Sequence, residues 1–214
     1  MHPPTGPLTL TPCRRSGPGR GAELVIVEGD SAAGAVTRVR DADSQAVLPL
    51  RGKPLNALRA PLARVAGHAF FAALATALGL PIGAPVDPRQ AAFDRVVLLM
   101  DPDADGIHCG ALVVVFLLRW MRPLVEEGRV LMIRPPWGEV VAAADARRIA
   151  LAWSEEELRA LSAAHGSAAT ARRFRGLACL DDSLLARSCV AAATRRTEHV
   201  SVAAAESIAL VLGE

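Results

Sequence analysis

Three aspartates that follow a buried apolar run constrain this chain more than any other feature of its sequence. The run Val96–Met100 is continuous and of strand length, which is typical of a strand covered on both faces. Three carboxylates follow at every second position, Asp101, Asp103 and Asp105. A second apolar run, Ala111–Leu118, is long enough for a helix. Ligands of open α/β sheets lie beyond the carboxyl ends of the strands, so the three carboxylates are expected where a ligand would bind.

Carboxylates this close in sequence repel one another unless water or a cation lies between them. Oxygen ligands favour Mg²⁺, for which Mn²⁺ or Ca²⁺ can substitute, over zinc. DPDADG fits the first six positions of an EF-hand calcium loop, but position twelve is Leu112 and not a bidentate glutamate. The remaining alternatives are a metal site and an exposed acidic turn that caps a helix.

A second strand is expected at Glu23–Val27, and it too runs into an acidic turn and a helix. Asp30 or Ser31 is expected to cap that helix. Glu28 differs from them because it stands at the end of the strand, before the cap. If the two strands are adjacent and parallel, Glu28 and Asp101 point into one crevice and form a divalent-metal site.

A third strand is expected at Ala46–Leu50, followed by a loop that carries Arg51, Lys53 and Asn56. Lys53 is the only lysine of the chain, which suggests a position where a compact ammonium is needed. Cations beside an acidic crevice would hold a polyanion near the metal, whereas the plainer interpretation is a charged surface loop.

A helix is expected from about Gly106 to Val125, interrupted near Pro123. His108 lies in its first turn, on the crevice side if Asp105 caps the helix. It would then contact phosphate or a carboxylate; a purely structural histidine is the alternative.

Composition limits the class of protein. The formal charge is only +2, so contact with nucleic acid requires a local patch. No apolar run is long enough to cross a bilayer, and the four scattered cysteines suit a reducing cytoplasm. The sequence contains no tyrosine, so a reaction that needs a tyrosyl nucleophile requires another chain.

Three segments are expected. Residues 1–22 are rich in proline and glycine and predict a flexible or extended lead-in, and residues 23–137 hold the strands and helices described above. Residues 138–214 are expected to form a strand, a helix with Ser154 and Glu157 as capping box, a basic turn RRFRG, and two helices around a short strand. The whole predicts an α/β fold.

Several blocks of the sequence resemble, in order and spacing, the TOPRIM region of the B subunit of the type IIA topoisomerases, bacterial DNA gyrase and topoisomerase IV. These blocks are EGDSAAG, QAVLPLRGKPLNA, TALGLPIG, VVLLMDPDADGIH and MRPLVEEGRVLMIRPPW, and RRFRGL resembles the segment that follows. The resemblance implies a Rossmann-like, mostly parallel sheet flanked by helices, with a small α+β C-terminal tail.

The resemblance also implies roles for single residues. Glu28, Asp101, Asp103 and Asp105 would bind Mg²⁺, and Glu28, Asp101, Asp103 and Lys53 would be catalytic. Lys53 and Asn56 would contact DNA. Arg51 and His108 are expected to contact DNA as well, because of their places beside the acidic crevice. The attacking tyrosine would come from an A-type partner subunit.

The chain departs from the family pattern at several points. No glycine-rich nucleotide loop of the ATPase domain is recognisable, so the expectation is no ATP site here, an ATPase on a separate chain, and no activity of the chain alone. Pro102 replaces an alanine, Cys109 and Gly110 replace an isoleucine and an arginine, and Cys179 replaces a glutamate.

Three hypotheses follow. The first is a Mg²⁺-binding component of a type IIA DNA topoisomerase. The second is a non-catalytic module that binds DNA or a topoisomerase and regulates it. The third is a small metal-dependent nuclease with water as nucleophile.

Overall fold

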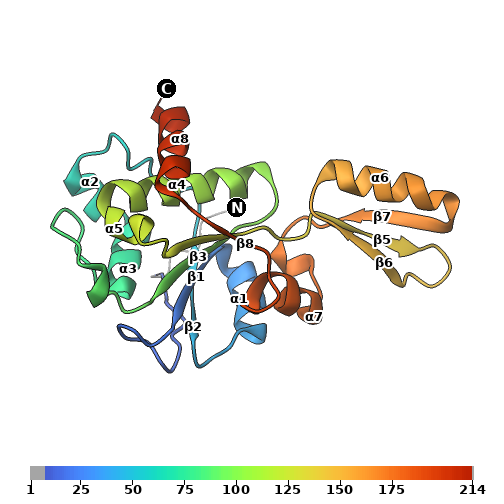
Figure 1. The fold of residues 1–214 in the computed structure, drawn as a ribbon, viewed down its shortest axis with the longest axis horizontal. Coiled ribbons are helices and arrows are strands. Elements are labelled where there is room, and N and C mark those ends of the chain that lie inside the picture. The colour runs from blue at the N-terminus through green and yellow to red at the C-terminus, as the bar shows by residue number, and fades with distance from the viewer. Residues whose placement is uncertain (1–7, 214) are drawn as a thin grey trace.

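The main body of the protein is a five-stranded sheet flanked by helices (Figure 1). The computed structural model describes residues 8–213. In spatial order the strands are β2 (Gln45–Leu50), β1 (Glu23–Glu28), β3 (Arg95–Leu99), β4 (Val130–Ile133) and β8 (Thr197–His199). The first four are parallel, and β8 pairs with β4 in the antiparallel sense. The three strands expected from apolar runs before residue 100 are thereby confirmed.

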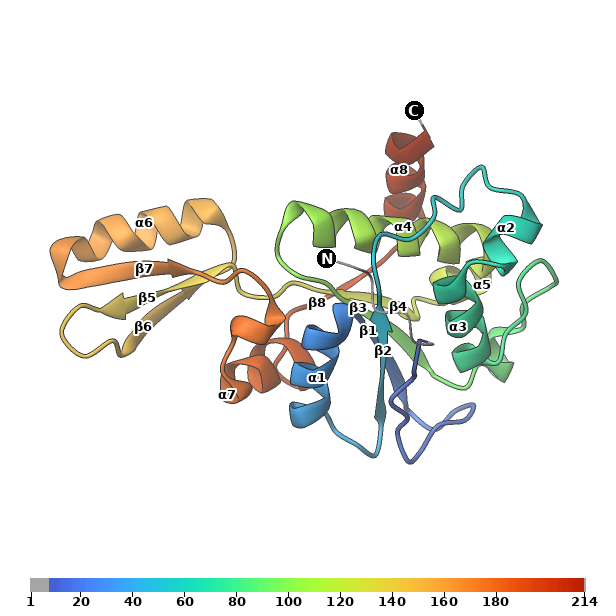
Figure 2. The same ribbon diagram turned by 180° about the vertical axis from the view of Figure 1, so that it is seen from behind.

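Alternate residues of these strands enter two separate cores, which explains why the strands are apolar at nearly every position. Leu24, Ile26 and Leu98 belong to the core under α3 (Ala69–Leu78) and α4 (Ala104–Trp120). Val25, Val97 and their alternates belong to the core under α1 (Gly29–Val39) and α7 (Asp182–Leu185). Figure 2 shows α1 and α3 on opposite sides of the sheet.

The chain reverses its direction of winding at β1. It leaves β1 through α1 to reach β2 on one side, then crosses the other face through α2 (Leu62–Ala66) and α3 to reach β3 on the opposite side of β1. The carboxyl ends of β1 and β3 therefore flank a topological switch point, the usual ligand-binding position of such sheets.

The long helix expected from Gly106 to Val125 is interrupted as expected. It consists of α4 and α5 (Arg122–Glu126), and the break is at Met121, one residue before the first turn that contains Pro123. The two helices expected between residues 55 and 79 are α2 and α3.

Residues 138–173 form a second, smaller unit, called here the small sheet module. Three antiparallel strands, β5 (Gly138–Ala142), β6 (Arg148–Ala152) and β7 (Ala169–Arg173), pack one face against α6 (Glu155–His165). The sequence predicted one strand and a basic turn here; instead there is a hairpin, and the first two arginines of RRFRG lie on β7. In Figure 1 the module extends away from the main sheet.

The chain then returns to the main body. Residues after the module add β8 to the edge of the sheet and α8 (Val202–Gly213) against α4. The strand β5 starts at Gly138, and the second half of the segment 138–214 completes the main sheet.

The described part of the lead-in, which was expected to be flexible or extended, is held against the main body. Thr11 pairs with Val47 beside β2, and Cys13 is buried. The backbone N–H groups of Gly19 and Gly21 donate to the Asp94 carboxylate. Residues 1–7 of the predicted lead-in lie outside the described residues. Among residues 8–213, no helix has both the length and the apolarity that a membrane span requires.

Candidate functional site

Glu28 is the last residue of β1, and Asp101 lies just beyond the end of the neighbouring parallel strand β3. Val27 of β1 pairs with Leu99 of β3, so Glu28 and then Asp101 follow at the same edge of the sheet. Gly29 has φ of +76°, in the left-handed region that glycine adopts freely, and turns the chain from β1 into α1. The structure thus brings together two acidic turns that are far apart in the sequence.

The Glu28 carboxylate is incompletely satisfied. Its Oε2 atom is buried and has no hydrogen-bond partner within the described chain. Burial raises the pKa of Glu28, the charges of the three nearby aspartates raise it further, and the Lys53 ammonium acts in the opposite direction. An orphaned acceptor surrounded by like charges is the environment that a bound cation relieves.

Asp101 is half-buried at the centre of this edge. Burial raises the pKa of Asp101, and the charge of Asp103 raises it further. The hydrogen bond from the Leu177 backbone N–H lowers the pKa but does not outweigh burial. The Leu177 nitrogen lies 2.8 Å from Asp101 Oδ1. Sequence reasoning missed this contact; the only available signal was the RRFRGL block, whose place in the fold the sequence does not reveal.

Asp103, and not Asp105, caps the helix α4. Its Oδ1 accepts a hydrogen bond of 2.8 Å from Gly106 N, so the cap at Asp105 that was considered as a condition for the position of His108 does not form. The reason is that α4 begins at Ala104, earlier than a cap at Asp105 allows. Asp105 is exposed in the first turn and faces Lys53 instead.

The first acidic helix also begins earlier than predicted. Helix α1 starts at Gly29, so neither Asp30 nor Ser31 caps it, and Glu28 occupies the cap position without a side-chain hydrogen bond. Asp30 pairs with Arg51, whose Nε lies 2.9 Å from Asp30 Oδ1. This correction leaves Glu28 unengaged by the helix.

Lys53 reaches the acidic edge from the loop after β2. Its Nζ lies 3.2 Å from Asp105 Oδ1 and 3.4 Å from His108 Nδ1. His108 therefore lies beside Lys53 at the acidic edge, although Asp103 and not Asp105 caps the helix. The Lys53 side chain remains 48% exposed, so its ammonium is accessible to a ligand.

Asn56 faces away from this group. Its Nδ2 donates to the Leu212 carbonyl of α8 at 2.9 Å, and its Oδ1 accepts from Leu58 N at 3.0 Å. Of the residues expected at the site, the structure brings Glu28, the three aspartates, Lys53 and His108 to one region, with Arg51 held by Asp30 and Asn56 engaged with α8.

The donor set suits a hard divalent cation, but the carboxylates are not gathered into a closed cage. Oxygen donors alone are the preferred ligands of Mg²⁺, and Glu28 offers an oxygen without a partner. Within residues 8–213, no group of three His, Cys, Asp or Glu side chains is assembled to hold a metal. Asp103 and Asp105 are each engaged elsewhere, with the α4 backbone and with Lys53.

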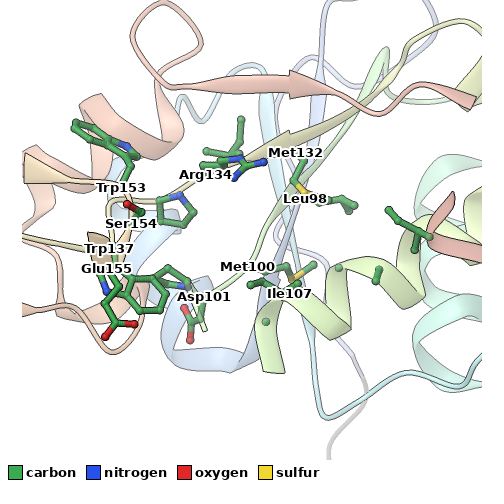
Figure 3. A pocket seen from close by; sticks show the side chains of 17 residues that line it. Leu98, Met100, Asp101, Ile107, Met132, Arg134, Trp137, Trp153, Ser154 and Glu155 are labelled. Carbon is green, nitrogen blue, oxygen red and sulfur yellow. The ribbon is translucent and has the colours of Figure 1, made fainter. Parts of the chain in front are cut away.

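A cavity of about 440 Å³ adjoins the acidic edge. Its lining is mostly apolar and includes Met100, Met132, Trp137 and Trp153, and Figure 3 shows Asp101 among the side chains around it. It separates the main sheet from the start of α6, so the acidic edge lies where the two units of the chain meet.

Comparison with known proteins gives a consistent result. The family model described as Toprim domain matches residues 23–135. The chain is 34% identical over 194 residues to the B subunit of DNA topoisomerase 4 from Streptococcus pneumoniae, covering 90% of this chain and 30% of that protein. It is 37% identical over 176 residues to the B subunit of DNA gyrase from Thermus thermophilus, covering 80% of this chain and 27% of that protein. The chain thus spans less than a third of the length of these relatives.

Proposed function

Because the chain belongs to the Toprim domain family, we propose that it supplies the metal-binding part of a type IIA DNA topoisomerase centre. In this proposal Glu28, Asp101 and Asp103 hold Mg²⁺, and Mn²⁺ can replace it. The nucleophilic tyrosine comes from an A-type subunit, since this sequence has none. The observation that carries the proposal is the position of Glu28 beside Asp101 at the switch point of the sheet, with a buried oxygen that has no partner among residues 8–213.

The residues of the site divide the work by charge. The carboxylates of Glu28, Asp101 and Asp103 provide oxygen ligands. When bound, the ion would stabilise negative charge on the leaving 3′ oxygen and on the scissile phosphate. Lys53, oriented by Asp105, offers its ammonium to the DNA backbone next to that position.

The contacts with DNA are ranked by exposure, because Lys53 and Arg51 each pair with an aspartate but their side chains are 48% and 23% exposed. Lys53 and His108 lie together at the acidic edge and are the main contacts. Arg51 must exchange its pairing with Asp30 for a phosphate, and Asn56 must leave the Leu212 carbonyl. Arg51 and Asn56 therefore contribute less than Lys53 to DNA affinity.

The test is formation of a covalent DNA adduct. The chain, an A-type subunit from the same source, supercoiled DNA and Mg²⁺ are mixed, and adducts are trapped with detergent. Adducts are expected with the wild type and are expected to disappear with Glu28→Ala or Asp101→Ala.

Asp30→Ala is the matched control, because Asp30 lies in the same acidic turn as Glu28 but pairs with Arg51. The control is expected to keep its adducts. Wild-type protein that yields no adduct with Mg²⁺ or Mn²⁺ would contradict the proposed function.

A non-catalytic regulator of a topoisomerase is the second candidate. It is favoured by the finding that the described carboxylates are not assembled into a group of three around one position. This candidate predicts that a variant in which Glu28, Asp101, Asp103 and Asp105 are all alanine still binds and inhibits a complete topoisomerase. The enzyme component predicts instead that the wild type yields covalent DNA adducts with an A-type subunit and that this variant yields none.

A further inference from the structure

The segment that returns from the small sheet module closes over the side chain of Asp101. Gly176 and Leu177 follow shortly after β7 ends at Arg173. The Leu177 backbone N–H donates to Asp101 Oδ1 at 2.8 Å, across 76 positions of the chain. This hydrogen bond holds one oxygen of the carboxylate and leaves the other, Oδ2, outside the contact.

Gly176 leaves no room for a side chain on the Asp101 side. A Cβ atom at residue 176 would lie 2.8 Å from Asp101 Oδ2 and 3.1 Å from its Cγ. The backbone of Gly176 is extended, with φ of 175°, so the conformation itself does not demand glycine. The requirement is one of space, and the atoms that would be displaced are those of the carboxylate.

A second glycine, Gly106 on α4, lies against the backbone of Asp101. A Cβ at Gly106, in the first turn of α4, would lie 2.2 Å from the Asp101 carbonyl oxygen. Asp101 is thus confined by α4 through its main chain and by the return segment through its side chain.

The return segment is itself firmly anchored. The Leu177 side chain is fully buried in the core that also holds Val27 and Leu99, the last apolar residues of β1 and β3. Because this side chain is fixed beneath the acidic edge, the direction of the Leu177 N–H is fixed as well.

We propose that Gly176 and the Leu177 N–H position the Asp101 carboxylate for metal binding. The inference rests on the proposed function, since it concerns the same metal site. The N–H holds Oδ1, and the bare Gly176 lets the carboxylate lie in this orientation with Oδ2 available to the ion. Partners that orient a metal ligand typically change metal affinity about 10–100-fold when they are removed.

Leu177→Pro removes the N–H at a position that tolerates proline, the first residue of a 3-10 turn (Leu177–Cys179) that follows an extended residue. Leu177→Ala is its matched control, because it also truncates the buried side chain but keeps the N–H. Mn²⁺ affinity measured by calorimetry is expected to fall about tenfold or more in Leu177→Pro relative to Leu177→Ala.

Gly176→Ala tests the space requirement without any loss of core packing. The added methyl group displaces the carboxylate, so Mn²⁺ affinity is expected to fall about tenfold. Gly34→Ala is the control, since a Cβ at Gly34 on α1 meets no atom within 4 Å. Its Mn²⁺ affinity is expected to equal that of the wild type.

Amide hydrogen exchange gives a readout that needs no metal. In the metal-free protein, Asp101→Ala is expected to accelerate exchange of the Leu177 amide, because its acceptor is gone. Unchanged exchange at Leu177, or equal Mn²⁺ affinity within both matched pairs of variants, would overturn the positioning role. Wild-type protein that binds no Mn²⁺ would instead contradict the proposed function.

Discussion

The two ends of strand β1 carry glutamates in opposite circumstances. Glu23, at the amino end, is buried, and both of its carboxylate oxygens accept hydrogen bonds from the buried Arg195 guanidinium at 2.7 and 2.8 Å. Gln45 donates a third hydrogen bond at 2.9 Å. Burial alone would raise the pKa of Glu23, but these donors and their charge lower it below the ordinary value.

Glu28, at the carboxyl end, is less buried, yet it keeps a buried oxygen without a partner in the described chain and has aspartates as neighbours. Its pKa is raised, in the opposite direction to that of Glu23. Glu23 is therefore fully hydrogen-bonded and stabilises the fold. Glu28, on the same strand, keeps an oxygen that a ligand can bind, because nothing in the described chain occupies it. The candidate site therefore differs from the amino end of β1 in having a carboxylate, Glu28, whose buried oxygen lacks a partner in the described chain.

The largest expected effect on stability comes from breaking the ion pair between Glu23 and Arg195. Arg195→Ala removes the buried counter-ion of Glu23 and leaves the carboxylate its longer pair with the half-exposed Arg95 at 3.5 Å. The free energy of unfolding is expected to fall by about 3–5 kcal/mol. Urea unfolding followed by circular dichroism measures this loss. Arg134→Ala, which breaks an exposed pair with Glu198, is the control and is expected to cost less than about 1 kcal/mol. Equal losses of stability in the two variants would contradict the claim that the buried pair of Glu23 stabilises the fold more than an exposed pair does.

A smaller effect on stability is expected when Mg²⁺ binds at Glu28. Mg²⁺ at about 100 times its dissociation constant is expected to stabilise the wild type by about 2.7 kcal/mol, seen as a rise in Tm that a chelator reverses. Glu28→Gln is expected to lose this rise, whereas Arg134→Ala keeps it. A chelator-sensitive rise that persists in Glu28→Gln would place the ion elsewhere.

The smallest effect concerns the pH dependence of the unpaired end without metal. Because the pKa of Glu28 is raised on folding, its ionised form destabilises the protein at neutral pH, and this penalty is lost as the pH falls through the raised pKa toward 4.5. In chelator, Glu28→Gln is expected to be more stable than the wild type near neutral pH.

The gain in Glu28→Gln is expected to vanish as the pH approaches about 4.5. Glu23 should show the reverse dependence. Its pKa is lowered, so its contribution is present above 4.5 and is lost as the pH falls through the lowered pKa. Unfolding of the wild type, Glu28→Gln and Glu23→Gln across this pH range measures the contrast, and a gain in Glu28→Gln that is independent of pH would contradict it.

Features encoded in short runs of sequence were predicted well. The strands β1, β2 and β3 and the break near Pro123 follow from continuous apolar runs and a helix-breaking residue. Helix starts were predicted less well. Both α1 and α4 begin one or more residues before the expected caps, because neighbouring polar residues such as Asp103 and Asp105 are equally capable of capping and only tertiary contacts choose between them.

Contacts between distant segments were beyond the sequence. The lead-in was predicted as flexible or extended because its proline- and glycine-rich sequence shows no periodicity, and the sequence did not reveal that Thr11 pairs with Val47 of β2. The hairpin β5–β6 was missed because its strands are short and β6 is only partly buried, so the apolar pattern that marks a strand is weak.

The sequence by itself determined the chemistry: which residues are acidic, that strands precede them, and that no tyrosine is available. Only the tertiary structure decided that β1 and β3 are neighbours, that Glu28 keeps an oxygen without a partner in the described chain, and that Gly176 and Leu177 close over Asp101. The physical reason is that the order of strands in a sheet and the return of a distant segment depend on burial summed over the whole chain, which no local pattern records.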